Sequence, residues 1–261
     1  MKSAVMHVGV NVSNTRPLLM VLPVFEDNSF IFVPIPVVGE GTVYRELHDS
    51  APGVCDILEQ LGYSIDTEVH NDPEFAEFTF GEGPRDWMLA RLYPGDFVFF
   101  VASMKKIPVP SKADFLKSPK LYSEELKCLL KQNRGPNWFY GLIAQIRLSQ
   151  IFAGKNEIRR YNLYDRCREL DITVEDTLRT NAHIKRGDHH TGEYIIIKGE
   201  RNESKVYHQA LPISHGNTPL TELQDIFYNH ALKRNRAKWF EVILDEEGTN
   251  LLLNFINSNR W

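Results

Sequence analysis

The chain has 261 residues, of which 43% are hydrophobic and 25% are charged, a balance typical of a soluble globular protein. A net charge of −4 argues against a protein that coats nucleic acid without specificity, although it allows local basic clusters. The three cysteines have no CxxC spacing and no segment approaches the roughly 20 apolar residues that cross a bilayer, so we expect a cytoplasmic protein without disulfides or a membrane partner.

The first third of the chain contains short strands and one helix. Residues 5–12 are predicted to form a strand, and residues 30–36 a second strand that its two prolines confine to a sheet edge. Residues 50–61 are expected to form a helix, because apolar side chains recur at helical spacing until Gly62 ends it.

Two apolar stretches are expected to form the centre of the sheet. Residues 97–103 carry no charge and follow a Gly-Asp turn signal, as in a strand buried on both faces. Residues 138–148 return as a second strand, with polar side chains two positions apart near its end. We therefore predict that these are neighbouring strands of one strongly bent sheet, with residues 104–136 as a helical insertion outside it.

The C-terminal part supplies further strands and one clear helix. The strands are predicted over residues 193–198, 204–211 and 238–244. A helix is expected to start at Thr218-Pro219, because apolar residues follow at helical spacing, and residues 251–256 form an element of undetermined type. Without a linker or a repeat, the chain is expected to be a single integrated α+β domain over residues 1–261, with helices around a bent mixed sheet.

A series of short blocks spans nearly the whole chain. The blocks are Gly9-Val10-Asn11, residues 30–36, His70-Asn71-Asp72-Pro73-Glu74-Phe75, Phe78-Thr79-Phe80-Gly81-Glu82, Gly95-Asp96-Phe97, Tyr140-Gly141 and Asn181-Ala182-His183-Ile184-Lys185-Arg186. In this order they resemble the third type of the nucleotide-modification-associated domain family. The resemblance implies a setting in which modified nucleotides or bases are handled, and it implies no particular reaction.

A second resemblance concerns the fold alone. The Gly-Asp turn, the aromatic strand and the Gly-containing strand after the insertion are similar to the central strands of the PUA-like class, which includes domains that read modified bases. This likeness implies a pseudo-barrel as an alternative form of the bent sheet, and it is an analogy of fold only.

The loop over residues 70–82 is the first candidate site. It combines polar side chains with three phenylalanines, and a base-binding pocket needs both stacking surfaces and groups that bond to the base edge. Trp87 follows this loop and is a further candidate for stacking. The alternative is structural, because Asn-Asp-Pro is a common turn signal and the phenylalanines are suited to the core.

A basic segment over residues 181–186 is the second candidate. Its Lys185 and Arg186, together with Arg159 and Arg160, could neutralise phosphate, although a solvated basic face is an equal alternative. The residues predicted to bind the ligand are His70, Asn71, Phe80, Trp87, Asn181, His183, Lys185, Arg186, Arg159 and Arg160.

Neither a metal centre nor a familiar catalytic motif is predicted. His183, His189 and His190 lack ligand spacing such as HExxH, and there is no Walker loop, GxGxxG or GxSxG sequence. The candidate catalytic residues are Asp72, Glu74 and Glu82. Such carboxylates could serve as a general base or bind Mg²⁺ beside a phosphate, and Mg²⁺ is the one cofactor kept open.

These patterns predict a pocket for a nucleotide or a modified nucleic-acid base where residues 70–82 meet residues 181–186. The first alternative is an enzyme that acts on such a ligand, and the second is a protein-interaction module. The sequence leaves open the identity of the base, the choice among DNA, RNA and free nucleotide, the occurrence of catalysis, and the oligomeric state.

Overall fold

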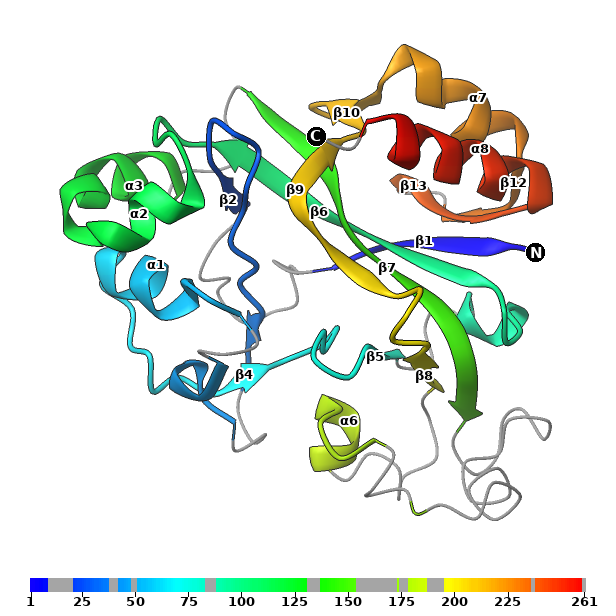
Figure 1. Ribbon diagram of the computed structural model, residues 1–261, viewed down its shortest axis with the longest axis horizontal. Helices are drawn as coiled ribbons and strands as arrows, with labels where there is room; N and C mark the ends of the chain where they lie inside the picture. The colour runs from blue at the N-terminus through cyan, green and yellow to red at the C-terminus, as the bar shows by residue number, and fades with distance from the viewer. Residues whose placement is uncertain are drawn as a thin grey trace.

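A computed structural model describes residues 1–8, 21–37, 42–47, 51–82, 88–130, 137–153, 173, 178–186, 195–235 and 238–259. Its main feature is a nine-stranded sheet in the order β12-β13-β1-β6-β7-β8-β5, with β2 paired to β6 and β9 paired to β7 (Figure 1). The strands are β1 Ser3–His7, β2 Leu22–Val24, β5 Thr79–Glu82, β6 Phe97–Lys106, β7 Trp138–Ala153, β8 Ile195–Gly199, β9 Lys205–Pro212, β12 Ala231–Asn235 and β13 Lys238–Leu244.

The two central strands are neighbours, as the sequence predicted. Strand β6 pairs antiparallel with β7 over a register from Phe97 opposite Arg147 to Lys105 opposite Trp138. The 16 residues of β7 pair with β9 along their first part and with β8 along their last part, so one long strand joins two parts of the sheet. Within the described residues the sheet does not close into a barrel, which agrees with a bent mixed sheet in an α+β protein.

Both faces of β6 are buried from Phe97 to Lys105, and most of the side chains on each face are apolar. Val98, Phe100 and Ala102 belong to one hydrophobic cluster, whereas Phe99 and Val101 belong to another on the opposite face. Such a strand needs helices or loops over both faces, since neither face can be left to water.

Different helices cover the two faces. Helices α1 Val54–Gln60, α2 Lys112–Lys117 and α3 Ser123–Leu130 bury apolar side chains in the first cluster. Helices α7 Thr221–Asn229 and α8 Glu246–Ser258 bury theirs in the second. Figure 1 shows these two groups of helices well apart, with β9 crossing between them. No helix among the described residues is long and apolar enough to cross a membrane.

Several boundaries differ from the sequence predictions for local reasons. The helix expected at Thr218 begins at Thr221, because Thr218–Pro219 forms β11, which pairs with β10 Ser214–His215. The undetermined C-terminal element is α8, whose first turn is capped by Asp245: the carboxylate accepts the Gly248 N–H at 2.7 Å.

Two other elements are shorter than expected. Of residues 30–36, only β3 Ile35–Pro36 forms a strand, which pairs with β4 Val69–His70. The helix expected from Ser50 begins at Val54, after Gly53 with its positive φ of 92°. The predicted insertion over residues 104–136 begins within β6, which continues to Lys106, and then supplies α2, the 3₁₀ helix Pro119–Tyr122 and α3.

Candidate functional site

The predicted meeting of residues 70–82 and 181–186 is present in the structure. Strand β4 ends at His70, the chain turns, and β5 leads back into the sheet beside β8. The short helix α6 Ala182–Lys185 lies next to this turn (Figure 1). The two segments are in direct contact, since Nε2 of His183 lies 3.4 Å from a carboxylate oxygen of Asp72.

The side chains of His70, Asp72 and His183 converge on one point, and we call these three residues the polar cluster. Nε2 of His70 lies 3.7 Å from Oδ2 of Asp72, the same oxygen that His183 approaches. The two imidazole rings stand edge to face with their centroids 5.0 Å apart. Each residue of the polar cluster offers one ligand atom, and these atoms all lie within 4.8 Å of one another.

The backbone of β5 fixes the position of the Asp72 carboxylate. The Gly81 N–H donates to both carboxylate oxygens, at 3.0 and 3.1 Å. The Asp72 side chain is buried, and burial alone would raise its pKa, but hydrogen bonds and charge from His183 and His70 outweigh it and the pKa is lowered. Asp72 is therefore a buried carboxylate held in its charged form.

Two contacts place His183 over β5. Asn181 caps α6 by accepting the His183 N–H at 3.0 Å, and its amide donates to the Thr79 hydroxyl at 3.3 Å. A Cβ at position 81 would lie 2.2 Å from Cδ2 of His183, so only glycine allows the imidazole to come this close to the strand. The Asn181 cap and the glycine together direct His183 towards Asp72.

Glu74 has a structural role in the same turn. Its carboxylate accepts the N–H groups of Ala76 and Glu77 at 2.8 and 2.9 Å, and it also accepts the Thr180 hydroxyl at 3.1 Å. This buried side chain ties residues 70–82 to the segment before α6. Of the three carboxylates predicted to be catalytic, Asp72 lies in the polar cluster and Glu74 caps a turn.

The basic side chains lie at the edge of the polar cluster. Nζ of Lys185 donates to the Thr42 hydroxyl at 3.3 Å, and the exposed Arg186 guanidinium lies 3.5 Å from Nδ1 of His183. Asn71 is partly buried between His70 and Asp72. The predicted residues that lie outside the described ones are Trp87, Arg159, Arg160, His189 and His190, together with the side chain of Glu82.

The three phenylalanines of this loop have different surroundings. Phe80 is 7% exposed and its ring packs against Phe100, with centroids 5.1 Å apart. Phe80 therefore packs in the core, which was the structural alternative to stacking on a base. Phe78 is partly buried against the same cluster. Phe75 is partly exposed and its ring meets that of Phe32 edge to face at 5.4 Å.

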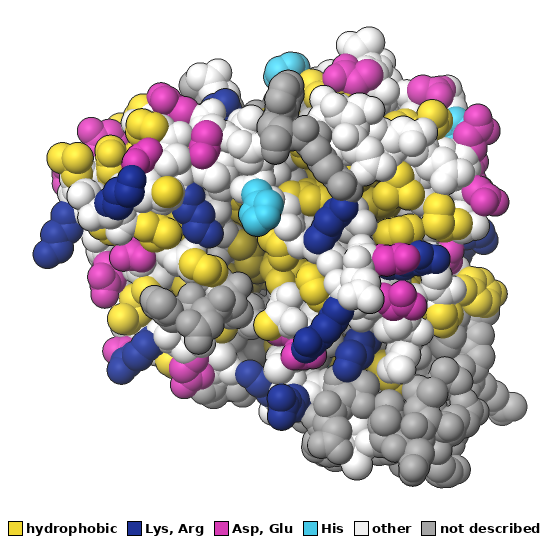
Figure 2. Space-filling model, viewed as in Figure 1, with side chains coloured by type: hydrophobic (Ala, Val, Ile, Leu, Met, Phe, Trp, Pro, Cys, Tyr) yellow, Lys and Arg dark blue, Asp and Glu magenta, His cyan; other side chains and the backbone are white. Residues whose placement is uncertain are grey.

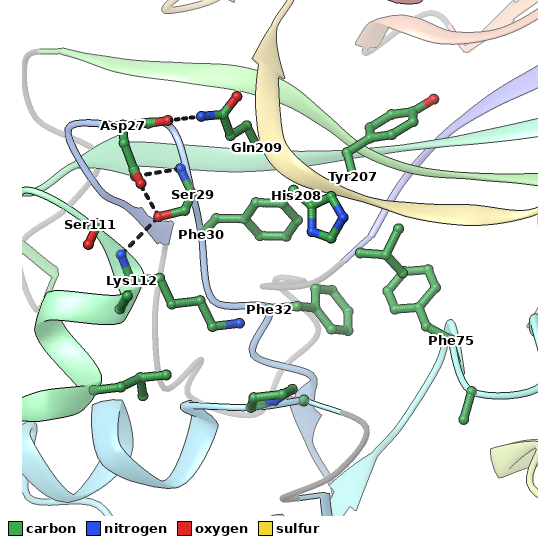
Figure 3. A pocket seen from close by; sticks show the side chains of 16 residues that line it. Asp27, Ser29, Phe30, Phe32, Phe75, Ser111, Lys112, Tyr207, His208 and Gln209 are labelled. Carbon is green, nitrogen blue, oxygen red and sulfur yellow. Dashed lines mark hydrogen bonds between the residues drawn. The ribbon is translucent and has the colours of Figure 1, made fainter. Parts of the chain in front are cut away.

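Phe75 also lines a cavity of about 850 Å³, which we call the aromatic cavity. Its walls come from residues 27–32, helix α2, strand β9 and the turn at residues 75–76. Figure 3 shows the rings of Phe30, Phe32, Phe75 and His208 facing it, whereas Tyr207 points away. The Tyr207 hydroxyl donates to Gln145 at 2.9 Å, which accounts for that orientation.

One cation in the aromatic cavity stands out. Figure 3 shows the side chain of Lys112 extending into it from the start of α2. Burial lowers the pKa of the Lys112 ammonium group. No carboxylate among the described residues forms an ion pair with it, in contrast to Lys117 on the same helix, which pairs with Asp114 at 3.1 Å. A partly desolvated ammonium group without a counter-charge favours an anionic ligand.

Polar groups surround the same cavity. The Ser29 hydroxyl accepts the backbone N–H of Lys112 at 2.9 Å and donates to Asp27 at 2.5 Å, and Gln209 donates to the Asp27 carbonyl at 2.6 Å. Figure 2 shows hydrophobic side chains gathered in a hollow in the middle of this face, with Lys and Arg side chains around it. Apolar walls with a few fixed polar groups are typical of small-molecule sites.

The sequence predictions missed this cavity. Phe30 and Phe32 were placed in an edge strand, and residues 204–211 were treated as a strand without a site. In the structure, His208 and Val206 of β9 are exposed and alternate with half-buried neighbours. The sequence of this strand does not itself show that exposure. What could not be read from the sequence is that β9, α2 and the Phe75 turn meet.

The structure thus defines an α+β protein with an open, bent sheet, a polar cluster and an adjoining aromatic cavity. The family model described as Nucleotide modification associated domain 3 matches residues 2–250. The chain belongs to this family, and the resemblance expected from its ordered blocks is confirmed. No curated protein and no solved structure matches the chain.

Proposed function

We propose that this protein binds a nucleotide or a modified nucleic-acid base, with the base in the aromatic cavity and a phosphate at Lys112. The observation that carries this proposal is the Lys112 ammonium group, which extends into a cavity faced by aromatic rings and has no carboxylate partner among the described residues. The family description, which associates the domain with nucleotide modification, supports the same ligand class.

The aromatic cavity has the dimensions and the chemistry that a nucleotide needs. Its volume of about 850 Å³ is within the range of small-molecule pockets, roughly 300–1,000 Å³. Phe75 and His208 are not fully buried, so their rings can offer surface to a base, and Phe30 and Phe32 form the apolar floor. Stacking of one base on an aromatic ring contributes about 1–3 kcal/mol.

The turn that contains the polar cluster also contributes to this cavity. Phe75 follows Asp72 by three residues, so their Cα atoms lie at most about 11 Å apart, at the extended reach of roughly 3.6 Å per residue. The predicted pocket between residues 70–82 and 181–186 is therefore retained as the neighbouring polar side of the proposed site. The exposed Arg186 is suited to a further phosphate there.

The test is a binding titration with matched nucleosides and nucleotides, with modified bases and with short single-stranded DNA and RNA. Lys112→Met should weaken nucleotide binding about tenfold or more while leaving nucleoside binding unchanged, because only the phosphate loses its partner. Lys117→Met is the control, since this lysine lies on the same helix outside the cavity and already has a carboxylate partner.

The stacking surface is tested by Phe75→Ala and His208→Ala, with His215→Ala as an exposed histidine outside the cavity. Phe75→Ala should weaken nucleosides and nucleotides alike, by about 5- to 150-fold, which corresponds to 1–3 kcal/mol of stacking. The proposal is wrong if no member of the panel binds, or if Lys112→Met and Lys117→Met have equal effects.

A second candidate, an enzyme acting on the bound nucleotide, is favoured by one observation. A charged, buried carboxylate in contact with two imidazoles is an arrangement suited to general acid–base chemistry. Incubation with the nucleotides that bind should then give a product that is absent with Asp72→Asn. Binding without any product would leave the protein as a binder only.

A further inference from the structure

We infer that the polar cluster is a binding site for one divalent transition-metal ion of the Zn²⁺, Fe²⁺ and Mn²⁺ class, with His70, Asp72 and His183 as ligands. This inference is independent of the proposed nucleotide site. It rests on the convergence of two imidazole nitrogens on one carboxylate oxygen that the backbone holds in place.

The separations are close to those that a common ion imposes. Ligand atoms 2.0–2.1 Å from a tetrahedral ion lie about 3.4 Å from one another. Nε2 of His183 and Oδ2 of Asp72 are 3.4 Å apart, and the corresponding separation from His70 is 3.7 Å. The third separation, between His70 and His183, is at most 4.8 Å, and a small rotation of the His70 side chain, the most exposed of the three, can shorten it.

The types of donor atom select the class of ion. Imidazole nitrogens favour Zn²⁺, Fe²⁺, Mn²⁺ and related ions, whereas Mg²⁺ and Ca²⁺ prefer sets made of oxygen atoms. Two histidines and one carboxylate leave at least one position of the ion for water or a ligand, as in catalytic sites and unlike the closed four-ligand structural sites. The sequence analysis considered His183, His189 and His190 as one possible set of ligands and the carboxylates of Asp72, Glu74 and Glu82 as another, for Mg²⁺. It did not combine His70 with Asp72 and His183.

The surroundings orient the ligands independently of one another. The Gly81 N–H fixes Asp72, the Asn181 cap fixes the start of α6, and β4 places His70 opposite Ile35. Loss of a hydrogen bond that orients a metal ligand typically lowers metal affinity by 10- to 100-fold. A ligand set positioned from three separate elements binds an ion with little reorganisation.

Arg186 lies on the side of the His183 ring that faces away from Asp72. Its guanidinium is 3.5 Å from Nδ1 of His183, whereas Nε2 faces Asp72. Coordination of an ion through Nε2 leaves the proton of the neutral imidazole on Nδ1, and because a guanidinium can only donate, the exposed Arg186 must then turn away. Arg186→Ala should therefore leave the metal affinity unchanged or raise it.

The competing explanation is purely structural, with two histidines that neutralise a buried carboxylate. The two explanations differ for the wild-type protein, because only a metal site gives a stoichiometric complex. Metal-depleted protein should bind one equivalent of Zn²⁺ by calorimetry and should give visible absorption bands with Co²⁺. A bound ion should also raise the melting temperature in a concentration-dependent manner.

The ligands are tested by His70→Ala, His183→Ala and Asp72→Asn, each of which should lower Zn²⁺ affinity by at least about 100-fold. His230→Ala is the matched control, since it removes a histidine that also contacts carboxylates, and it should leave the affinity unchanged. Equal affinities of the wild type and the His70→Ala and His183→Ala proteins would overturn the inference.

A measurement on the unmodified chain covers the case in which the variants fold poorly. Of the nine histidines, those whose imidazole nitrogen resonances shift on addition of one equivalent of Zn²⁺ should be His70 and His183. A shift confined to other histidines would show that Zn²⁺ binds elsewhere and would contradict the inference as firmly as no shift at all.

Discussion

Two regions of the molecule place histidine against carboxylate, and they do so with opposite geometry. In the polar cluster, two imidazoles point at one oxygen of a single buried carboxylate. At the start of α8, one imidazole lies between two carboxylates: Nδ1 of His230 faces Asp245 and Nε2 faces Asp225, at 3.3 and 3.5 Å.

The difference shows how the same residue types serve different purposes. Opposite nitrogens of one ring point in opposite directions, so the His230 group cannot direct its atoms at a single ion. Its residues instead join α7 to the first turn of α8, where Asp245 is also the helix cap. Convergence, rather than the count of histidines and acids, distinguishes a candidate site from a structural ion pair.

The largest effect is expected from removal of the shared carboxylate. Asp72→Ala leaves the buried Gly81 N–H without its acceptor and two histidines without their partner, so we expect a loss of about 3 kcal/mol in the free energy of unfolding. Asp225→Ala removes a carboxylate whose side chain is 62% exposed and should cost about 0.5 kcal/mol or less. Denaturant unfolding of the wild type and both variants tests this contrast, provided that the three proteins show equal m-values. Comparable losses would show that the two groups are equivalent.

A smaller but more specific effect concerns the approach of His183 to β5. Gly81→Ala introduces a Cβ 2.2 Å from Cδ2 of His183, and overpacking of this kind costs about 1–3 kcal/mol. The double variant Gly81→Ala/His183→Ala removes the clash. The double variant should therefore be no less stable than His183→Ala alone. A double-mutant cycle would then show a strong coupling between positions 81 and 183. Additive losses would mean that the alanine is harmful for another reason.

Residues that lie close together in the sequence allowed much of the fold to be predicted. The apolar residues 97–103 and 138–148 identified two buried strands, and their pairing as β6 and β7 followed from one turn signal and one insertion. The elements that the sequence misplaced depend on single contacts. The start of α7 is an example, because Thr218–Pro219 pairs with β10 before the helix begins.

The candidate site was harder to predict, since its parts are distant in the chain. The contact between residues 70–82 and 181–186 was expected from their chemistry, and the structure shows it. His70 and Asp72 are two positions apart, but their third partner, His183, lies on another element, so no local spacing reveals the polar cluster. The aromatic cavity was harder still to predict from the sequence, because Lys112 and His208 lie on elements that contain no functional motif.

The smallest effect is expected from His230, and its sign follows from its neighbours. Burial would lower the pKa of His230, but the hydrogen bond and charge of Asp245, with the charges of Glu247 and Asp225, outweigh this and raise the pKa. A raised pKa in the folded state stabilises the protein below the unfolded value of about 6.5, and this contribution disappears as the pH rises through the folded pKa.

At pH 5.5 the wild type should therefore be more stable than His230→Gln, by less than about 1 kcal/mol, which is the upper range for partly exposed ion pairs. The difference should shrink at pH 8.5. Unfolding of both proteins at the two pH values measures this difference, because the titration of groups that do not interact with His230 cancels in the comparison. A difference that grows with pH would mean that the carboxylates do not hold His230 in its charged form, and the contrast with the polar cluster would then rest on geometry alone.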